Sequence, residues 1–458
     1  MLIDDKKSLK TNFVVFLIDG LRYDQIHGEQ KESFTPNIDS LIEKGTFFTN
    51  SFSCVDGTIL SLNTIFNSVF SCRTGNRARQ IFFKENNIFD ILKKSDYELY
   101  GLVPKMKIYE PLTKIFKNEE TTYDWLEKNE SLQDTLFTKI SNLLEKINKS
   151  PLSFTYIHLL DLHPLREGKI PKGLEKFQDE KFGNSNYSKT VSSIDAKLGK
   201  VFEQIDLSKT VIILTADHGE RIPFGNISNA ELEPRFESAK KIGKKLFPKK
   251  SYLVSGKVLS KISKSIQEKK IKENGKDLTH YQKRSRYPYF TLSLHDEVLH
   301  VPLLFVGKNI GKQIKNDFIR HVDLYPTILD LINFDYDDKM IDGRSFFPFE
   351  KDTNYDELFS YLHTIPYEKP HPSDSVGIRT KKYKYIRSEH SKNDAYLYDV
   401  LNDPFENNNI IDEQSQLAKK FEEMIKSVEN SKMVSNESDF SNEEEEMIKE
   451  ELRKMGYS

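Results

Sequence analysis

Two short apolar segments of this chain lead into acidic residues, and this pattern constrains the fold more than any other feature. Residues 211–214 read Val-Ile-Ile-Leu and are soon followed by Asp217 and His218, while residues 13–18 are followed directly by Asp19. Unbroken apolar runs of this length are typical of parallel strands buried on both faces. Ligands of open α/β sheets collect at the carboxyl ends of such strands. The pattern therefore predicts an α/β fold with these three polar residues at one edge of its sheet.

The residue types at this predicted edge suit a divalent metal. Carboxylate oxygens from Asp19 and Asp217 and an imidazole nitrogen from His218 form a mixed oxygen and nitrogen ligand set. Such a set is compatible with Mn, Zn, Mg or Ca. We therefore predict a metal site, and with it an enzyme.

Segments of strand length alternate with segments of helical periodicity along most of the chain. The expected strands cover residues 13–18, 98–103, 153–160, 211–215 and 301–306, and the helical patterns include residues 36–44, 59–70, 132–147 and 192–205. This alternation predicts a doubly wound, mostly parallel sheet with helices on both faces. After Pro348, strand-like pieces at 358–362, 383–387 and 396–400 and a helical pattern at 417–428 predict a small α+β subdomain. We therefore predict a catalytic domain over residues 1–348, and a C-terminal subdomain with a helical tail over residues 349–458.

Composition argues against several classes of protein but does not indicate a binding partner. The formal net charge is -2, and the two cysteines, Cys54 and Cys72, form no CxxC pair, so neither a disulfide framework nor a thiolate zinc site is expected. The N-terminus is polar, and no run of about 18 apolar residues follows, so neither a signal peptide nor a transmembrane segment is expected. These features predict a cytoplasmic protein that does not bind nucleic acid.

A basic insertion at about residues 225–290 differs in composition from its surroundings. Between Lys240 and Arg286 it carries about sixteen Lys or Arg against about three acids. One interpretation is a solvated, partly helical insertion, and the other is a basic rim that attracts an anionic polymer, headgroup or substrate.

Thr58 opens a helical pattern directly after the turn residues Asp56 and Gly57. A hydroxyl at a helix N-terminus faces unpaired N–H groups and the positive end of the helix dipole. Both favour an alkoxide and an anionic group attached to it, and a metal would favour the ionised hydroxyl further. Thr58 is therefore a candidate nucleophile, although a threonine at this position is often only a helix cap.

A series of short motifs runs along most of the chain in a recognisable order. They read IDGLRYD (18–24), TPNID (35–39), GTFF (45–48), HLLDLHP (158–164), TADHGE (215–220), DEVLHVPL (296–303), DLYPTILDL (323–331), GRS (343–345), LYD (397–399) with DP (403–404), and LRKMGY (452–457). In this order they resemble the sulfatase-like branch of the alkaline phosphatase superfamily, of the threonine-nucleophile type.

The resemblance implies a single-metal core in which Asp19, Thr58, Asp217 and His218 are the metal ligands. It also implies that His163 contacts the substrate, steadying a non-bridging oxygen or protonating the leaving group. As an alternative, Asp161 and His163 could belong to a second metal site, as in two-metal relatives.

The chain also departs from the family pattern. Sulfatases that form formylglycine carry a Cys/Ser-x-Pro/Ala-x-Arg signature, whereas residues 58–62 read Thr-Ile-Leu-Ser-Leu, and threonine cannot yield the aldehyde. Gly20 stands where many sulfatases carry a second acid. Phe290 stands where the family often has a histidine, for which His280 or His295 could substitute.

These considerations predict a metal-dependent hydrolase or transferase that acts on phosphodiesters or phosphomonoesters through Thr58. The substrate is expected to be an anionic ester, glycan- or lipid-linked. Sulfuric ester hydrolysis is the first alternative, and a catalytically silent anion-binding protein is the alternative from another class.

Overall fold

The structure is a computed structural model of the 458-residue chain. It describes residues 11–75, 80–166, 169–221, 279–286, 292–351, 357–364, 374–391, 394–431 and 442–454. Most of the basic insertion lies outside these residues, as does Phe290, so neither interpretation of the insertion is tested.

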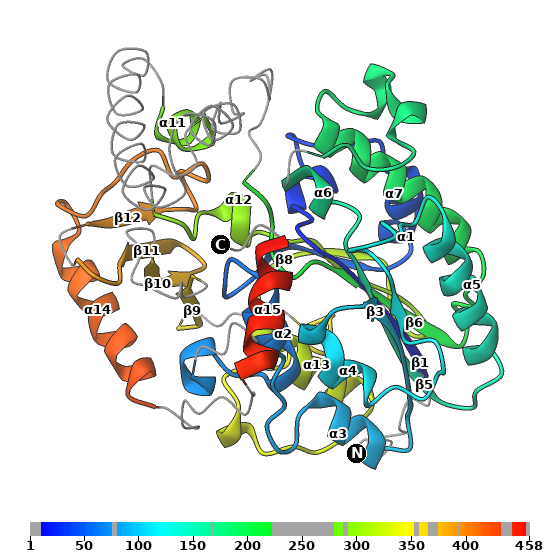
Figure 1. The fold of residues 1–458 in the computed structure, drawn as a ribbon. Helices are drawn as coiled ribbons and strands as arrows, with labels where there is room; N and C mark the ends of the chain where they lie inside the picture. The colour runs from blue at the N-terminus through cyan, green and yellow to red at the C-terminus, as the bar shows by residue number, and fades with distance from the viewer. Residues whose placement is uncertain are drawn as a thin grey trace.

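One large sheet runs through the larger part of the molecule and confirms the predicted fold class (Figure 1). Its eight strands lie in the order β4-β3-β5-β1-β6-β7-β2-β8. The bounds are β1 (Asn12–Ile18), β2 (Thr46–Phe52), β3 (Glu98–Pro104), β4 (Thr122–Tyr123), β5 (Ser153–Leu159), β6 (Thr210–Thr215), β7 (Leu303–Gly307) and β8 (Gln313–Arg320). Strands β3, β5, β1 and β6 pair in parallel, and their central residues are buried because helices cover both faces.

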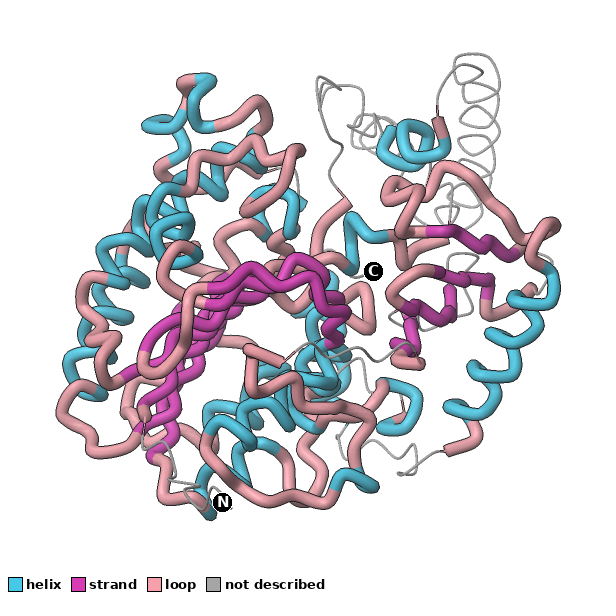
Figure 2. Tube along the Cα trace, turned by 180° about the vertical axis from the view of Figure 1, so that it is seen from behind, coloured by secondary structure: helices cyan, strands magenta, loops and turns pink. Residues whose placement is uncertain are grey.

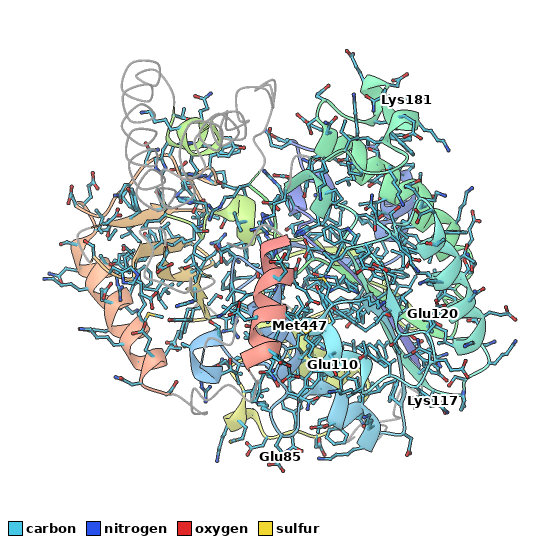
Figure 3. All side chains as sticks on the ribbon, in the orientation of Figure 1. Glu85, Glu110, Lys117, Glu120, Lys181 and Met447 are labelled. Atoms are coloured by element: carbon cyan, nitrogen blue, oxygen red, sulfur yellow. The ribbon has the colours of Figure 1, made fainter. Side chains whose placement is uncertain are left out.

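Two groups of helices sandwich this sheet. Figure 1 shows α1 (Pro36–Ile42), α5 (Thr135–Ile147) and α7 (Asn186–Phe202) on one face. On the other face lie α2 (Thr58–Asn67), α3 (Ile88–Lys94), α4 (Glu110–Thr113) and α13 (Leu324–Leu331), with α15 (Asn442–Lys454) outside them. Side chains fill the space between these layers (Figure 3). None of the described helices combines the length and apolar composition needed to cross a bilayer.

Two features of the sheet were not predicted from the sequence. The expected strand at 301–306 is β7, which runs antiparallel to both neighbours, β6 and β2. The two-residue strand β4 was missed, and so were the longer strands β2 and β8. Their apolar positions are interrupted by polar ones, such as Thr49 and Asn50, so each lacks the unbroken apolar run of a central strand.

A second, antiparallel sheet of four strands lies beside the first, in the order β12-β11-β10-β9 (Figure 2). Its strands are β9 (Phe359–His363), β10 (Ser375–Thr380), β11 (Tyr383–Ser388) and β12 (Ala395–Asp399), and α14 (Ser415–Glu429) packs on β10. The predicted α+β character of this region is confirmed. The proposed boundary at 348 falls between the strands of the two sheets, but their independence as domains stays a prediction.

The small sheet contacts the segment that leads into α2. The backbone N–H of His363 donates to the carbonyl of Cys54 at 3.1 Å, and His363 forms a bridge with Val55. Leu60 of α2 shares an apolar cluster with Val376 of β10. The small sheet therefore buttresses the turn that carries Thr58.

Candidate metal centre and active site

The carboxyl ends of two adjacent parallel strands bring the predicted ligands together. β1 and β6 pair in register from Asn12 with Thr210 to Leu17 with Thr215, so Asp19 and Asp217 leave the same edge of the sheet. Asp19, Asp217 and His218 are each at most 2% exposed. Buried carboxylates are rare unless they are paired or bind a cation.

Thr58 is the first residue of α2, and it faces this edge. Its Oγ1 donates to Asp19 Oδ2 at 2.9 Å and lies 3.3 Å from His218 Nε2. The backbone of the preceding Gly57 is extended, so the helix begins at Thr58. Every residue of α2 is buried. The four residues predicted as metal ligands therefore form one cluster.

Backbone contacts hold the loop after β6 against the turn after β1. Asp217 Oδ1 accepts from the backbone N–H of Gly20 at 3.1 Å and from that of His218 at 2.9 Å. Gly20 has a φ of 69°, a left-handed conformation that glycine adopts without strain. Ser61, one turn after Thr58, donates from Oγ to the Asp217 carbonyl at 2.7 Å.

One carboxylate oxygen of this cluster is left for a ligand. Asp217 Oδ2 is buried and has no hydrogen-bond partner among the described residues, although His218 Nε2 lies 3.5 Å away. Ligand atoms of Asp19, His158 and Asp217 also lie within 4.8 Å of one another. Two buried carboxylates with imidazoles around them fit a divalent cation. These residues are therefore suited to the metal that the sequence predicted.

Burial and neighbouring charges shift the pKa values of the residues in this cluster. Burial alone would raise the pKa of Asp19, but contacts with His158 and His163 hold that pKa well below its ordinary value. Burial and the charge of Asp19 raise the pKa of Asp217. For His218, burial opposes ionisation, yet the two carboxylates raise its pKa. Protons at these sites would be displaced on metal binding, because carboxylates and imidazoles coordinate in their deprotonated forms.

His163 borders the cluster, and its contact with substrate stays a prediction. It begins α6 (His163–Arg166), and its Nδ1 lies 3.4 Å from Asp19 Oδ1. Its ring meets the edge of Trp125 at a centroid distance of 5.0 Å. His163 therefore lies beside the candidate ligands, where it can reach a group bound between them and Thr58.

His158 is a site residue that sequence reasoning missed. It lies on β5, is fully buried, and places Nε2 3.9 Å from Asp19 Oδ2. A histidine inside an otherwise apolar strand is the signal that could have found it. Its relation to Asp19, however, depends on the pairing of β5 with β1.

The other residues considered from the sequence lie elsewhere. Asp161 is buried and accepts from the Leu132 N–H at 2.8 Å, and it joins neither group of three or more ligand-type side chains found among the described residues. His280 and His295 pack against each other and against Tyr398 of β12. Neither histidine takes part in the contacts of Thr58 described above.

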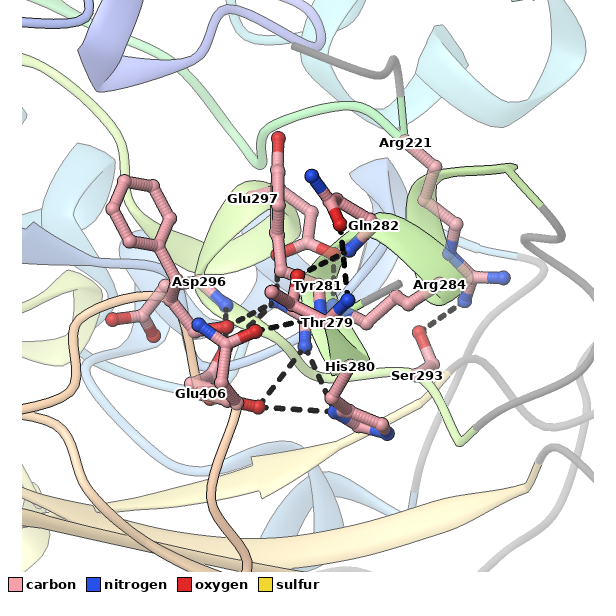
Figure 4. A network of polar contacts seen from close by, with 12 residues as sticks. Arg221, Thr279, His280, Tyr281, Gln282, Arg284, Ser293, Asp296, Glu297 and Glu406 are labelled. Carbon is pink, nitrogen blue, oxygen red and sulfur yellow. Dashed lines mark hydrogen bonds and ion pairs between the residues drawn. The ribbon is translucent and has the colours of Figure 1, made fainter. Parts of the chain in front are cut away.

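A buried ionic network lies next to the loop after β6 that carries Asp217 and His218 (Figure 4). The N–H of Gly219 donates to the carbonyl of Val298 in α12 (Asp296–Leu299) at 2.7 Å. Arg284 of α11 (His280–Arg286) binds Glu297 through Nε at 2.6 Å, and it also lies between Glu297 and Glu406. Lys384 of β11 pairs with both Asp296 of α12 and Glu406, so the network ties α12, and with it the loop that carries Asp217, to the small sheet.

Comparison with known families agrees with this geometry. Residues 11–334 match the family described as Sulfatase. The chain belongs to the sulfatase family. Residues 285–433 also match the family described as N-sulphoglucosamine sulphohydrolase, C-terminal. The resemblance seen in the sequence is thereby confirmed at family level, whereas the threonine nucleophile stays a prediction.

Individual relatives are distant. Arylsulfatase K of Rattus norvegicus is 25% identical over 148 residues, which cover 31% of this chain and 26% of that protein. The chain thus aligns with about a quarter of the length of this curated relative. The phosphonate monoester hydrolase of Agrobacterium radiobacter superposes with a TM-score of 0.63 at 12% identity, over 92% of this chain and 95% of that chain. A protein solved with its substrate D-glucosamine-2-N,6-O-disulfate gives a TM-score of 0.60 at 14% identity, over 92% and 98% of the two chains. At these identities the structural matches show the fold alone.

Proposed function

We propose that this chain is a divalent-metal-dependent hydrolase of anionic esters, with Thr58 as its nucleophile and phosphoesters as its substrate class. The observation that carries the proposal is the position of Thr58 Oγ1, 2.9 Å from Asp19 Oδ2 and 3.3 Å from His218 Nε2 at the start of a buried helix. A hydroxyl held among candidate metal ligands at a helix N-terminus is placed for attack on an anionic tetrahedral centre.

Asp19, Asp217, His218 and Thr58 would hold the metal. When bound, it would favour the ionised form of the Thr58 hydroxyl and offset negative charge on the transferred group. The Thr58 hydroxyl would release its proton to solvent, and Oγ1 would form a bond to phosphorus as the bond from phosphorus to the leaving oxygen breaks. His163 would give a proton to that oxygen. Water, or an acceptor alcohol, would then attack the phospho-threonine and regenerate the Thr58 hydroxyl.

Sulfuric ester hydrolysis is the second candidate, and the comparisons support it better than they support phosphoester cleavage. The family match is to sulfatases, and curated relatives are arylsulfatases. One structural neighbour binds a sulfated sugar, which favours an anionic, glycan-linked ester. Against this stands Thr58, because threonine cannot be converted to formylglycine, whereas a threonine hydroxyl can carry a phosphoryl group.

The test is hydrolysis of matched aryl phosphomonoester, phosphodiester and sulfate substrates by chelator-treated protein, with each divalent metal added back. Thr58→Ala should lose at least about a thousandfold in kcat/KM, because it removes the attacking oxygen. Thr64→Ala is the matched control, since Thr64 lies in the same buried helix and its hydroxyl donates to the Leu60 carbonyl at 2.8 Å. Thr58→Ser should retain measurable turnover.

Each outcome ranks the candidates. Metal-restored, Thr58-dependent phosphoester cleavage supports the proposal, and Thr58-dependent sulfate cleavage supports the second candidate instead. Cleavage that survives in Thr58→Ala removes Thr58 from the role. Bound metal without turnover on any substrate would favour a transferase with a specific acceptor, or a silent anion-binding protein.

A further inference from the structure

His158 is held between the candidate metal ligands and two buried tyrosines. Its Nδ1 lies 2.9 Å from the hydroxyl of Tyr156 on β5, and its Nε2 lies 3.3 Å from the hydroxyl of Tyr109. Its backbone carbonyl accepts from the Tyr123 hydroxyl at 2.9 Å. Tyr109, Tyr123, Tyr156 and His158 are all at most 1% exposed. The imidazole is therefore fixed in position and orientation by its surroundings.

The two ring nitrogens of His158 have unequal partners. The contact at Nδ1 has the length of a good hydrogen bond, while the contact at Nε2 is long. When a cation is bound, the imidazole can donate from Nδ1 to Tyr156 and present the lone pair of Nε2 to the cation in place of the contact with Asp19. That nitrogen faces Asp19 Oδ2 at 3.9 Å and belongs to the same ligand-atom group as Asp217. Metal-bound histidines commonly have this arrangement, with the far nitrogen held by a second group.

The turn after β1 contributes one acidic side chain to the cluster. Gly20 follows Asp19 and has no side chain, so this turn supplies a single carboxylate to the cluster. A β-carbon built at Gly20 would meet Glu220 at 3.8 Å and no atom of the cluster. Asp19 and Asp217 thus form the oxygen part of the site, and His218 and His158 are the imidazoles nearest to it.

We propose that His158 binds the divalent metal through Nε2, and that this second imidazole makes the site select Zn²⁺ over Ca²⁺ and Mg²⁺. Imidazole nitrogen suits zinc and the later transition metals, whereas calcium and magnesium prefer oxygen ligands throughout. Tyr156 is then a positioning residue, because it orients the imidazole without touching the metal. The proposal rests on the metal site of the proposed function, but not on the reaction carried out there.

The first test measures metal affinity in the full chain without any substrate. Zn²⁺ and Ca²⁺ are titrated separately into chelator-stripped parent protein and into His158→Gln by calorimetry. His158→Gln should bind Zn²⁺ more than about 100-fold more weakly and Ca²⁺ within about threefold of the parent. Tyr156→Phe should weaken Zn²⁺ binding about 10-fold. Unchanged Zn²⁺ affinity in His158→Gln would overturn the proposal.

The matched control is His300→Gln, which removes a partly buried imidazole. His300 stacks on Tyr23 and Phe52, and its Nε2 contacts the Thr49 carbonyl at 2.8 Å, outside the metal cluster. This variant should leave both metal affinities unchanged. An equal loss of Zn²⁺ affinity in His300→Gln would mean that the loss does not depend on which imidazole is removed, and would contradict a specific role for His158.

A second measurement does not depend on the folding of any variant. Parent protein loaded with Cu²⁺ should show two coordinated imidazoles by electron spin-echo modulation, from His158 and His218. One imidazole would overturn the proposal even if metal-dependent ester cleavage is found. Two imidazoles without cleavage of any ester would leave it standing while the proposed function fails.

Discussion

Ser61 Oγ donates to the backbone carbonyl of Asp217 at 2.7 Å, which couples α2, the helix that begins at Thr58, to the loop after β6 that carries the candidate ligands Asp217 and His218. The same Oγ lies 3.0 Å from Nδ1 of His321, which follows β8. Ser61 is one helical turn after Thr58 and is fully buried. This contact therefore ties the helix that carries Thr58 to the loop after β6 that carries Asp217 and His218.

Removal of this contact should reduce both stability and turnover. Ser61→Ala leaves the buried Asp217 carbonyl without its donor, which costs about 1–3 kcal/mol in the free energy of unfolding. We also expect a lower kcat, because Thr58 and Asp217 are no longer held together. Ser68→Ala is the matched control, since the Ser68 hydroxyl binds the Val322 carbonyl at 2.6 Å at the other end of the same helix. It should lose similar stability with no change in kcat, as measured by urea unfolding and steady-state kinetics. Equal kcat in Ser61→Ala and the parent would refute the coupling.

His163→Gln should slow the reaction in a way that depends on the leaving group. A general acid contributes about 10²–10⁴-fold, but only where the leaving oxygen needs a proton. Alkyl esters should therefore lose about that much in kcat/KM, whereas 4-nitrophenyl esters should lose far less. The measurement is a series of esters that differ in the pKa of the leaving alcohol. A uniform loss across the series would assign His163 to binding rather than to proton transfer.

Lys384→Met should lower the free energy of unfolding, because it disrupts the ionic network next to the loop that carries Asp217 and His218. Lys384 is fully buried, binds Asp296 Oδ1 at 2.7 Å and also pairs with Glu406. Loss of one partner from a buried ionic group costs about 3–5 kcal/mol, because charge is left without compensation. Exposed Lys382→Met should change stability by less than about 0.5 kcal/mol. Chemical unfolding of both variants gives the comparison, and a loss below about 1 kcal/mol in Lys384→Met would contradict the expectation.

Asp161 should make the protein less stable as the pH rises. Burial raises the pKa of Asp161 to about 7, above the ordinary value of about 4 for an unfolded chain. Between these values the folded state binds more protons than the unfolded state, so the free energy of unfolding falls with increasing pH.

The variant Asp161→Asn tests whether ionisation of Asp161 lowers the free energy of unfolding as the pH rises. It keeps an oxygen that can accept from the Leu132 N–H but does not ionise. Its stability advantage over the parent should grow from pH 4.5 to pH 8, where it should reach about 1–3 kcal/mol. Urea unfolding at several pH values measures this difference. Parallel pH profiles for the two proteins would show that Asp161 does not titrate in this window.

The sequence by itself determined those strands and site residues that depend on a short stretch of the chain. Unbroken apolar runs predicted β1 and β6 because a strand buried on both faces has no polar side, and the acids after them marked one edge. Asp19, Asp217 and His218 followed from that rule. Thr58 was a candidate from its place at the start of a helical pattern, and its roles as nucleophile and metal ligand were predicted from the resemblance to the sulfatase-like family.

Only the tertiary structure decided what depends on which segments become neighbours. The antiparallel direction of β7 depends on sheet pairing, which no run of residues encodes. The sequence does not show that His158 lies near Asp19. The pairing of β5 with β1 brings its Nε2 to 3.9 Å from Asp19 Oδ2. Ser61 likewise gains its role only when α2 packs beneath the loop after β6. The physical reason is that periodicity reports how one segment meets solvent and core, whereas a metal site needs the relative placement of segments far apart in the chain.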